Sequence, residues 1–171
     1  VKELKGGRAL FTQPPMPIKC AGAPQKAMYL SCNVWERSGV LKDIDVQFHN
    51  SGAVLFGVAV YVPALMEYVE RYNAHLNFES KRVAIDGPAK IATFEQKRGD
   101  IVTRVEESFD MIHVVPPQVA PEFIASSPLA APSGFVAVDE ATLRHPVHAN
   151  VFALGDVAAT SNAKTAAAAR K

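Results

Sequence analysis

This sequence of 171 residues has few cysteines, almost no net charge and no long apolar run. Its two cysteines, Cys20 and Cys32, are too few for the disulfide framework of a small secreted protein. A formal net charge of +1 argues against a protein that binds nucleic acid by neutralising phosphates. No apolar run reaches the ~20 residues of a membrane-spanning helix, and no signal peptide is visible.

The sequence also lacks an initiator methionine and a residue that would end a helix at its C-terminus. It begins with Val1 and closes on the alanine-rich run 165–171, a strong helix former without a C-cap. We therefore expect the chain to be an excised segment of a longer protein.

The order of the expected elements predicts an α/β fold. Strands are expected at 8–12, 45–49, 76–79 and 109–115, and helices are expected after Pro24 and around Pro63. Strands that alternate with helices favour a parallel sheet. In the first helix, Ala27, Leu30 and Val34 are expected to form one apolar stripe.

A second pattern follows the first sheet. Short extended runs at 82–85, 90–95 and 101–106 are separated by turn residues and predict an antiparallel β-meander. Further strands are expected at 135–138 and 151–154. This order is similar to that of the nicotinamide domain of two-dinucleotide flavoproteins. We expect a degenerate nicotinamide-type Rossmann-like domain at 1–118, and a loop with an incomplete C-terminal part of an FAD-binding domain at 119–171.

The glycine-rich dinucleotide loop of such a domain is missing. A G-x-G-x-x-G motif normally follows the first strand, whereas this chain has a proline-rich loop at 13–20. The loop at 51–57 has two glycines at the wrong spacing, and it places Leu55 and Phe56 where a pyrophosphate would need the backbone. The sequence therefore predicts the architecture of a nucleotide-binding domain without its nucleotide site.

Cys20 stands between the first expected strand and the first expected helix, directly after Lys19. A helix N-terminus and a neighbouring cation both favour the thiolate form of a cysteine, which indicates redox or nucleophilic chemistry. The alternative is a cysteine that packs as a small hydrophobic residue. Cys32 is expected inside the helix, on the order of 15 Å further along, so the two should not form a disulfide with each other.

Gly155 and Asp156 follow the expected strand at 151–154. A carboxylate at the carboxyl edge of a sheet can accept hydrogen bonds from ribityl or ribose hydroxyls, although Gly-Asp is also common in simple turns. Residues 162–165 are expected to open an alanine-rich helix, whose N–H groups could stabilise an electron-rich flavin ring. The pair His145 and His148 has no third ligand nearby, so no metal site is expected.

Three runs of this chain resemble the sulfide:quinone oxidoreductase family, in its bacterial and mitochondrial-like branch. They are residues 12–26, residues 113–117, and residues 151–156 taken together with 164–168. The resemblance covers nearly the whole chain and places it in the pyridine nucleotide-disulfide oxidoreductase superfamily. It implies an FAD enzyme that oxidises sulfide to a protein-bound persulfide or polysulfide and passes electrons through the flavin to a membrane quinone.

The resemblance also assigns roles to individual residues. It implies that Cys20, with Lys19 beside it, is the catalytic thiol near the flavin and joins a redox disulfide. The remaining matches are to cofactor-binding positions: Gly155 and Asp156 at the ribityl chain, Pro116 and Pro117 against the isoalloxazine ring, and Lys164 and Thr165 at a helix start beneath the pyrimidine end of the ring.

The chain departs from the family at two points. The mitochondrial-like branch has its second redox cysteine directly after Gly-Asp, and this chain has Val157 there. The N-terminal half of the FAD site, with its G-x-G-x-x-G motif, is also absent. We therefore expect FAD to bind the full-length protein, not to be retained by this chain alone, and the second cysteine to come from outside these residues.

Other functions stay open at this stage. The chain could belong to the flavin subunit of a flavocytochrome c sulfide dehydrogenase, to a type II NADH dehydrogenase-like flavoprotein, or to a degenerate, non-catalytic flavoprotein module. The preferred interpretation implies sulfide and quinone as substrates, a possible homo-oligomer and no nucleic-acid partner. It also implies peripheral attachment to a bacterial or mitochondrial inner membrane, through a region that this chain does not contain.

Overall fold

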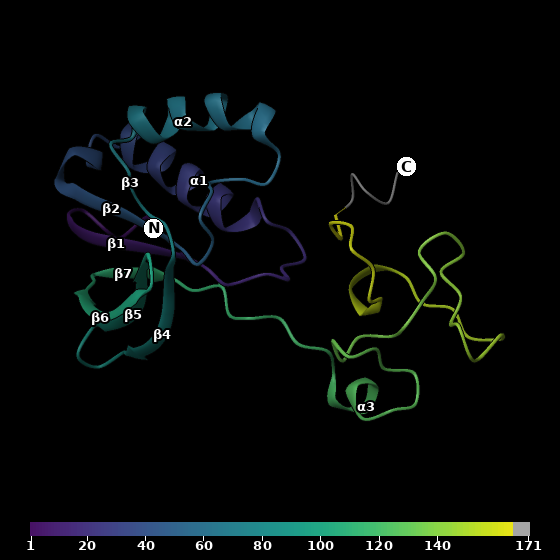
Figure 1. Ribbon diagram of the computed structural model, residues 1–171. Helices are drawn as coiled ribbons and strands as arrows, with labels where there is room; N and C mark the ends of the chain where they lie inside the picture. Colours follow the sequence, from purple (N-terminus) through teal and green to yellow (C-terminus); the bar gives the residue numbers. More distant parts are fainter. Residues whose placement is uncertain (166–171) are drawn as a thin grey trace. The chain divides into compact units, whose positions relative to one another are not determined.

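The computed structural model describes residues 1–165, which form two units (Figure 1). The first unit consists of Val1–Met16 and Ala21–Pro116, and the second consists of Pro17–Cys20 and the residues from Pro117 onward. The short segment Pro17–Cys20 thus belongs to the second unit.

The first unit contains a parallel sheet, an antiparallel sheet and two long helices. Its strands are β1 (Gly7–Gln13), β2 (Ile44–Asn50), β3 (His75–Asn77), β4 (Ser80–Asp86), β5 (Ile91–Arg98), β6 (Ile101–Ser108) and β7 (Met111–His113). Its α-helices are α1 (Ala23–Arg37) and α2 (Val62–Arg71), and short 3₁₀ helices lie at η1 (Leu41–Asp43) and η2 (Ala59–Tyr61). The expected α/β fold with a parallel sheet and an antiparallel meander is confirmed.

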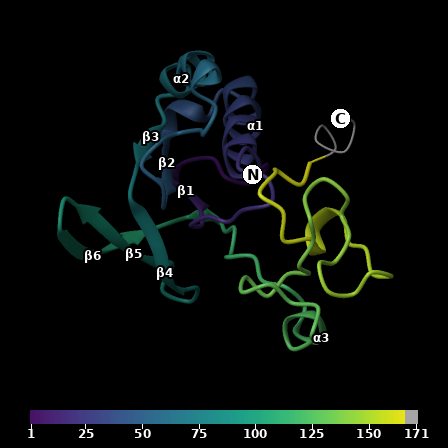
Figure 2. The same ribbon diagram turned by 45° about the vertical axis from the view of Figure 1, so that its right-hand side comes forward.

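The parallel sheet has the strand order β3-β2-β1-β7 and is covered on both faces. Helices α1 and α2 lie on one face, and the meander β4-β5-β6 lies on the other (Figures 1 and 2). Strand β1 is central and buried at residues 9–12, which include its apolar residues Ala9, Leu10 and Phe11. Phe11 faces the helices, in one core cluster with Met28 and Trp35, while Leu10 faces the meander together with Phe94.

The helices begin and end where local chemistry places them. Pro24 and Pro63 lie in the first turns of α1 and α2, where a missing N–H costs no helical hydrogen bond. Gly39 follows the end of α1 with a φ of +77°, a conformation that favours glycine. The predicted apolar stripe of α1 is wrong, because Leu30 and Val34 are 61% and 40% exposed.

The buried stripe of α1 instead contains Met28, Cys32 and Trp35. These side chains reach the sheet at i, i+4 and i+7 spacing, and the ring of Trp35 packs edge-on against Phe11. The indole N–H of Trp35 also donates to the carbonyl oxygen of Val1 at 2.9 Å. The contacts of Trp35 with Phe11 and Val1 therefore favour burial of this face of α1.

Specific contacts fasten the meander to the parallel sheet. His49 of β2 stacks on Phe94 of β5 with ring centroids 3.8 Å apart, and its Nδ1 lies 2.9 Å from Ser80 Oγ of β4. Arg8 of β1 pairs with Asp45 of β2 and with Glu107 of β6, both at 2.7 Å. The buried histidine and the arginine together connect the two sheets.

The second unit has little regular secondary structure within its described part. It contains the short helix α3 (Glu122–Ala125) and the 3₁₀ turn η3 (Gly155–Val157). The strands predicted at 135–138 and 151–154 are wrong, because these runs form only isolated bridges. Their apolar residues fill a small core instead, with Val136, Ala153 and Ala158 buried. An apolar run without a neighbouring strand cannot extend a ladder.

The C-terminal helix expected from residue 162 is not seen at 162–165, which form bends and coil. The rest of that predicted helix, 166–171, lies outside the described residues. In the part of the chain that is described, none of the helices has the length and apolar character needed to cross a membrane.

Candidate functional site

The loop after β2 contacts the N-terminal turn of α1, the position at which a nicotinamide domain binds its dinucleotide. Gln25 in the first turn is buried, and its side-chain amide donates to the carbonyl oxygen of Leu55. Leu55 is buried in the helical core cluster. Phe56 lies so close to Gly22 that a Cβ there would be 3.8 Å from its ring. The loop after β2 therefore packs against the first turn of α1.

In the second unit, Lys19 joins several segments that are far apart in the sequence. Its backbone N–H donates to Gln118 Oε1 at 2.6 Å, and its carbonyl oxygen accepts from the N–H of Lys164 at 2.9 Å. Its ammonium donates to the backbone carbonyl of Asp156 at 2.6 Å and lies 3.5 Å from the centroid of the Phe135 ring. Both peptide groups and the side chain of Lys19 are thus engaged.

The charge of Lys19 is held in a partly desolvated position. Burial lowers the pKa of its ammonium, the positive charge of Lys164 lowers it further, and the carboxylate of Asp156 acts in the opposite direction. This ammonium contacts the carbonyl oxygen of Asp156 and the ring of Phe135. Cys20 follows in the chain and is half-buried.

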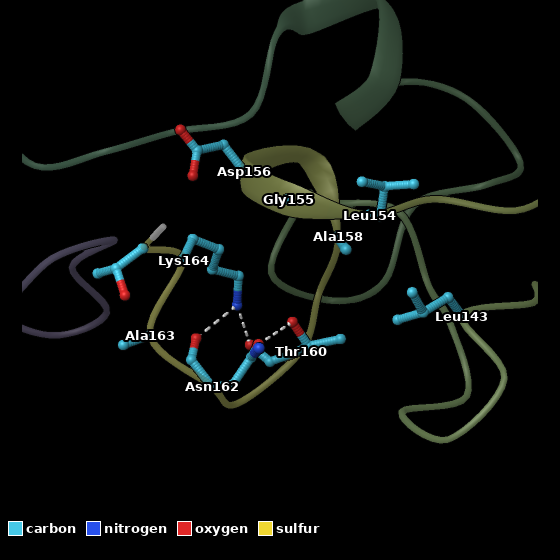
Figure 3. Close-up of a pocket in the computed structure, with 10 residues that line it drawn as sticks. Leu143, Leu154, Gly155, Asp156, Ala158, Thr160, Asn162, Ala163 and Lys164 are labelled. Carbon is cyan, nitrogen blue, oxygen red and sulfur yellow. Dashed lines mark hydrogen bonds between the residues drawn. The ribbon is translucent and has the colours of Figure 1, made fainter. Parts of the chain in front are cut away.

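A pocket of about 430 Å³ lies beside the Gly155–Val157 turn (Figure 3). Its lining includes four of the predicted cofactor-binding residues together with their neighbours: Leu143, Leu154, Gly155, Asp156, Ala158, Thr160, Asn162, Ala163, Lys164 and Thr165. Gly155 has a φ of +68°, and nothing lies within 4 Å of where its Cβ would be. Its backbone is therefore open to a close approach, and Asp156 beside it is exposed.

Lys164 closes one side of this pocket. Its ammonium donates to the carbonyl oxygens of Thr160 and Asn162, the latter at 3.1 Å, and Figure 3 shows the side chain folded over this turn. Its backbone N–H meanwhile donates to Lys19. Lys164 therefore shapes the turn 160–164 and links it to the segment that carries Cys20.

The structure brings most of the predicted site residues into one unit. Gly155, Asp156, Lys164 and Thr165 line the pocket, and Lys19 is bonded to Asp156 and Lys164. Pro117 also lies in this unit, next to Gln118, whereas Pro116 is the last residue of the first unit. Sequence reasoning missed Gln118 and Phe135. Gln118 stands in a loop without a motif, and Phe135 was assigned to a strand.

Cys32 belongs to the first unit. It is fully buried in α1, and burial raises the pKa of its thiol to about 12. Both cysteines are free. The expectation that Cys32 lies inside the first helix is confirmed.

His145 stabilises a turn through its side chain. Its Nδ1 accepts from the backbone N–H groups of Val147 and His148, at 3.1 and 3.0 Å, so it closes a turn. Among residues 1–165, no group of three or more His, Cys, Asp or Glu side chains is arranged to hold a metal ion.

The chain is similar to known proteins both in its sequence and in its fold. No family model matches the chain. The mitochondrial sulfide:quinone oxidoreductase of Schizosaccharomyces pombe is 39% identical over 170 residues, which are 98% of this chain and 37% of that protein. The resemblance to this family is thereby confirmed. The chain spans little more than a third of the length of the curated relatives it matches.

Two solved structures share the fold. One chain in the mitochondrial ATP synthase assembly of Tetrahymena thermophila superposes with a TM-score of 0.75 at 19% identity, over 95% of this chain and 40% of that one. The sulfide:quinone oxidoreductase of the hyperthermophilic bacterium Aquifex aeolicus gives 0.70 at 20% identity, over 89% and 36%. At these identities the likeness shows the Rossmann-like fold alone.

Proposed function

We propose that this chain is part of a flavoenzyme that oxidises sulfide and passes the electrons through FAD to a membrane quinone. The geometric observation that carries the proposal is the link made by Lys19. Within one unit, it ties the segment that bears Cys20 to the turn of Gly155 and Asp156, beside a pocket. The similarity to sulfide:quinone oxidoreductases over nearly the whole chain supplies the chemistry that this arrangement would serve.

The residues beside the pocket fit one part of FAD. The exposed carboxylate of Asp156 can accept hydrogen bonds from ribityl hydroxyls, and the open backbone of Gly155 allows the cofactor to come close. We assign Lys164 and Thr165 to the pyrimidine side of the flavin ring, and Pro116 and Pro117 to its face. When bound, FAD would accept two electrons from sulfur and release them to a quinone.

The Cys20 thiol is the proposed redox group of this chain. Attack of HS⁻ on a disulfide between Cys20 and a second cysteine breaks the sulfur–sulfur bond, leaving a persulfide on one sulfur and a thiolate on the other. That thiolate carries the two electrons that sulfide has given up. Cys32 is buried and Val157 has no thiol, so we assign the second cysteine to a part of the protein outside these residues.

We further propose that the full-length protein attaches peripherally to an inner membrane, where quinones are dissolved. The relatives at 39% identity are mitochondrial proteins by name, which supports the mitochondrial inner membrane as the site. The attachment would involve residues that this chain does not contain.

An anaerobic titration of the full-length protein with sulfide tests this function. Sulfide alone should bleach the oxidised flavin absorbance, and a water-soluble quinone added afterwards should restore it. If sulfide leaves the flavin oxidised, the assignment to sulfide chemistry is wrong. If sulfide bleaches the flavin but only cytochrome c restores it, the flavocytochrome c alternative is correct and the quinone is not the acceptor.

A further inference from the structure

We propose that Lys19 is a positioning residue that holds the Cys20 segment against the Gly155–Val157 turn, and that it is not the electrostatic partner of the Cys20 thiolate. We call this attachment of the segment 17–20 by Lys19 the clamp, and it follows from the contacts of Lys19. Its consequence for sulfide oxidation rests on the proposed function.

The contacts of Lys19 come from four separate places in the second unit. Gln118 receives its backbone N–H, Lys164 donates to its carbonyl oxygen, Asp156 receives its ammonium and Phe135 faces that ammonium with its ring. The bonds to Gln118 and Asp156 span 99 and 137 residues of sequence. Lys19 therefore fixes the segment 17–20 to the rest of the second unit.

The use of both peptide groups fixes the direction of the chain as it enters Cys20. A residue whose N–H and C=O are both bonded cannot rotate its backbone without losing a hydrogen bond. The side chain adds a third attachment, to the carbonyl of the same Asp156 that lines the pocket. The side chain of Lys19 therefore links the segment that carries Cys20 to the pocket.

The direction of the ammonium distinguishes a clamp from a thiolate partner. An ammonium that donates at 2.6 Å to a carbonyl and lies 3.5 Å from a ring centroid is committed to those two groups. A cation that served to stabilise a thiolate would instead be paired with sulfur. Removing the charge should thus loosen the segment that carries Cys20.

The test uses full-length protein with Lys19→Met, Lys19→Arg and Lys26→Met. Methionine keeps a long apolar stem without the charge, and arginine keeps both the cation and its donors. Lys26 is an exposed lysine of α1 outside the clamp and serves as the control. The rate of iodoacetamide alkylation of Cys20 is followed against pH by peptide mass mapping, and the sulfide-dependent reduction rate of bound flavin is followed by stopped flow.

Lys19→Met should raise the alkylation rate of Cys20 by roughly tenfold, the lower end of what a charged hydrogen bond contributes, at an unchanged pH midpoint. Flavin reduction should slow by a similar factor at unchanged FAD content. Lys19→Arg should restore most of the wild-type alkylation rate and most of the wild-type rate of flavin reduction. Lys26→Met should behave as wild type in both measurements. A pH midpoint that moves upward in Lys19→Met and returns in Lys19→Arg would overturn the proposal in favour of a thiolate partner.

Unchanged alkylation and flavin reduction in Lys19→Met would also overturn it. Phe135→Leu, which removes only the ring under the ammonium, covers the case in which Lys19→Met does not fold. It should give a smaller change in the same direction, and no change in a folded Phe135→Leu protein would contradict the clamp. If wild-type flavin is not reduced by sulfide at all, the proposed function fails, while the alkylation data still decide whether the clamp exists.

Discussion

Acid should weaken this fold through His49, and replacing that residue should remove the effect. Burial, with a smaller contribution from the charge of Arg8, lowers the pKa of His49 from 6.5 to about 4. In the unfolded chain the imidazole binds its proton near pH 6.5, whereas in the folded protein it stays neutral until about pH 4. Stability is therefore unaffected above pH 6.5 and is lost as the pH falls toward 4.

The size of this effect follows from the difference between the two pKa values. Each pKa unit corresponds to about 1.4 kcal/mol, so the His49 contribution amounts to about 2.5 kcal/mol by pH 4.5. The protonated ring would also have to remain stacked on Phe94, beside the 2.9 Å contact with Ser80. A loss of about 2.5 kcal/mol is a large fraction of the 5–15 kcal/mol by which domains are typically stable.

Urea unfolding at several pH values between 7 and 4.5 measures this contribution. His49→Gln should be less stable than wild type at pH 7, because the stacked ring is lost, but its stability should fall less steeply with acid. His75→Gln, at an exposed histidine of β3, should keep the wild-type slope. Parallel acid profiles of wild type and His49→Gln would refute the reasoning.

The remaining predictions concern the two cysteines and cofactor binding. Under native conditions at pH 8, iodoacetamide should label Cys20 and leave Cys32 unlabelled, because a pKa of about 12 leaves only about one thiol in ten thousand ionised; equal labelling would contradict the burial of Cys32. Asp156→Ala should weaken FAD binding to the full-length protein about tenfold in equilibrium dialysis, and the 171-residue chain alone should elute from gel filtration without flavin. NADH and NADPH should not bleach the flavin in stopped flow, since the loop 13–20 before α1 lacks the glycines that let a pyrophosphate approach a helix N-terminus; rapid bleaching would indicate a nicotinamide-dependent enzyme.

The parallel sheet and the meander could be predicted because their signals are local. Alternating strands and helices, with proline at the helix starts and glycine at the turns, fix the order of elements regardless of tertiary contacts. The buried face of α1 could not be predicted in the same way. Leu30 and Val34 look like core residues, but the packing of Trp35 on Phe11 turns them outward.

The second unit was less predictable, because its structure depends on contacts between distant segments. The apolar runs around Val136 and Ala153 have strand-like composition but fill a small core through isolated bridges. Motifs indicated Cys20 and the Gly155–Asp156 turn as candidates. They could not indicate that the ammonium of Lys19 is directed to the Asp156 carbonyl, since that depends on a contact across 137 residues.

The most direct test of the central claim is a single-turnover experiment on Cys20→Ser in the full-length protein loaded with FAD. Anaerobic sulfide is mixed with wild type, Cys20→Ser and Cys32→Ser, and the oxidised flavin absorbance is followed in the stopped flow. The account predicts rapid bleaching in wild type, most of that rate in Cys32→Ser and none in Cys20→Ser at equal FAD content. Undiminished bleaching in Cys20→Ser would show that the Cys20 thiol is not the redox group.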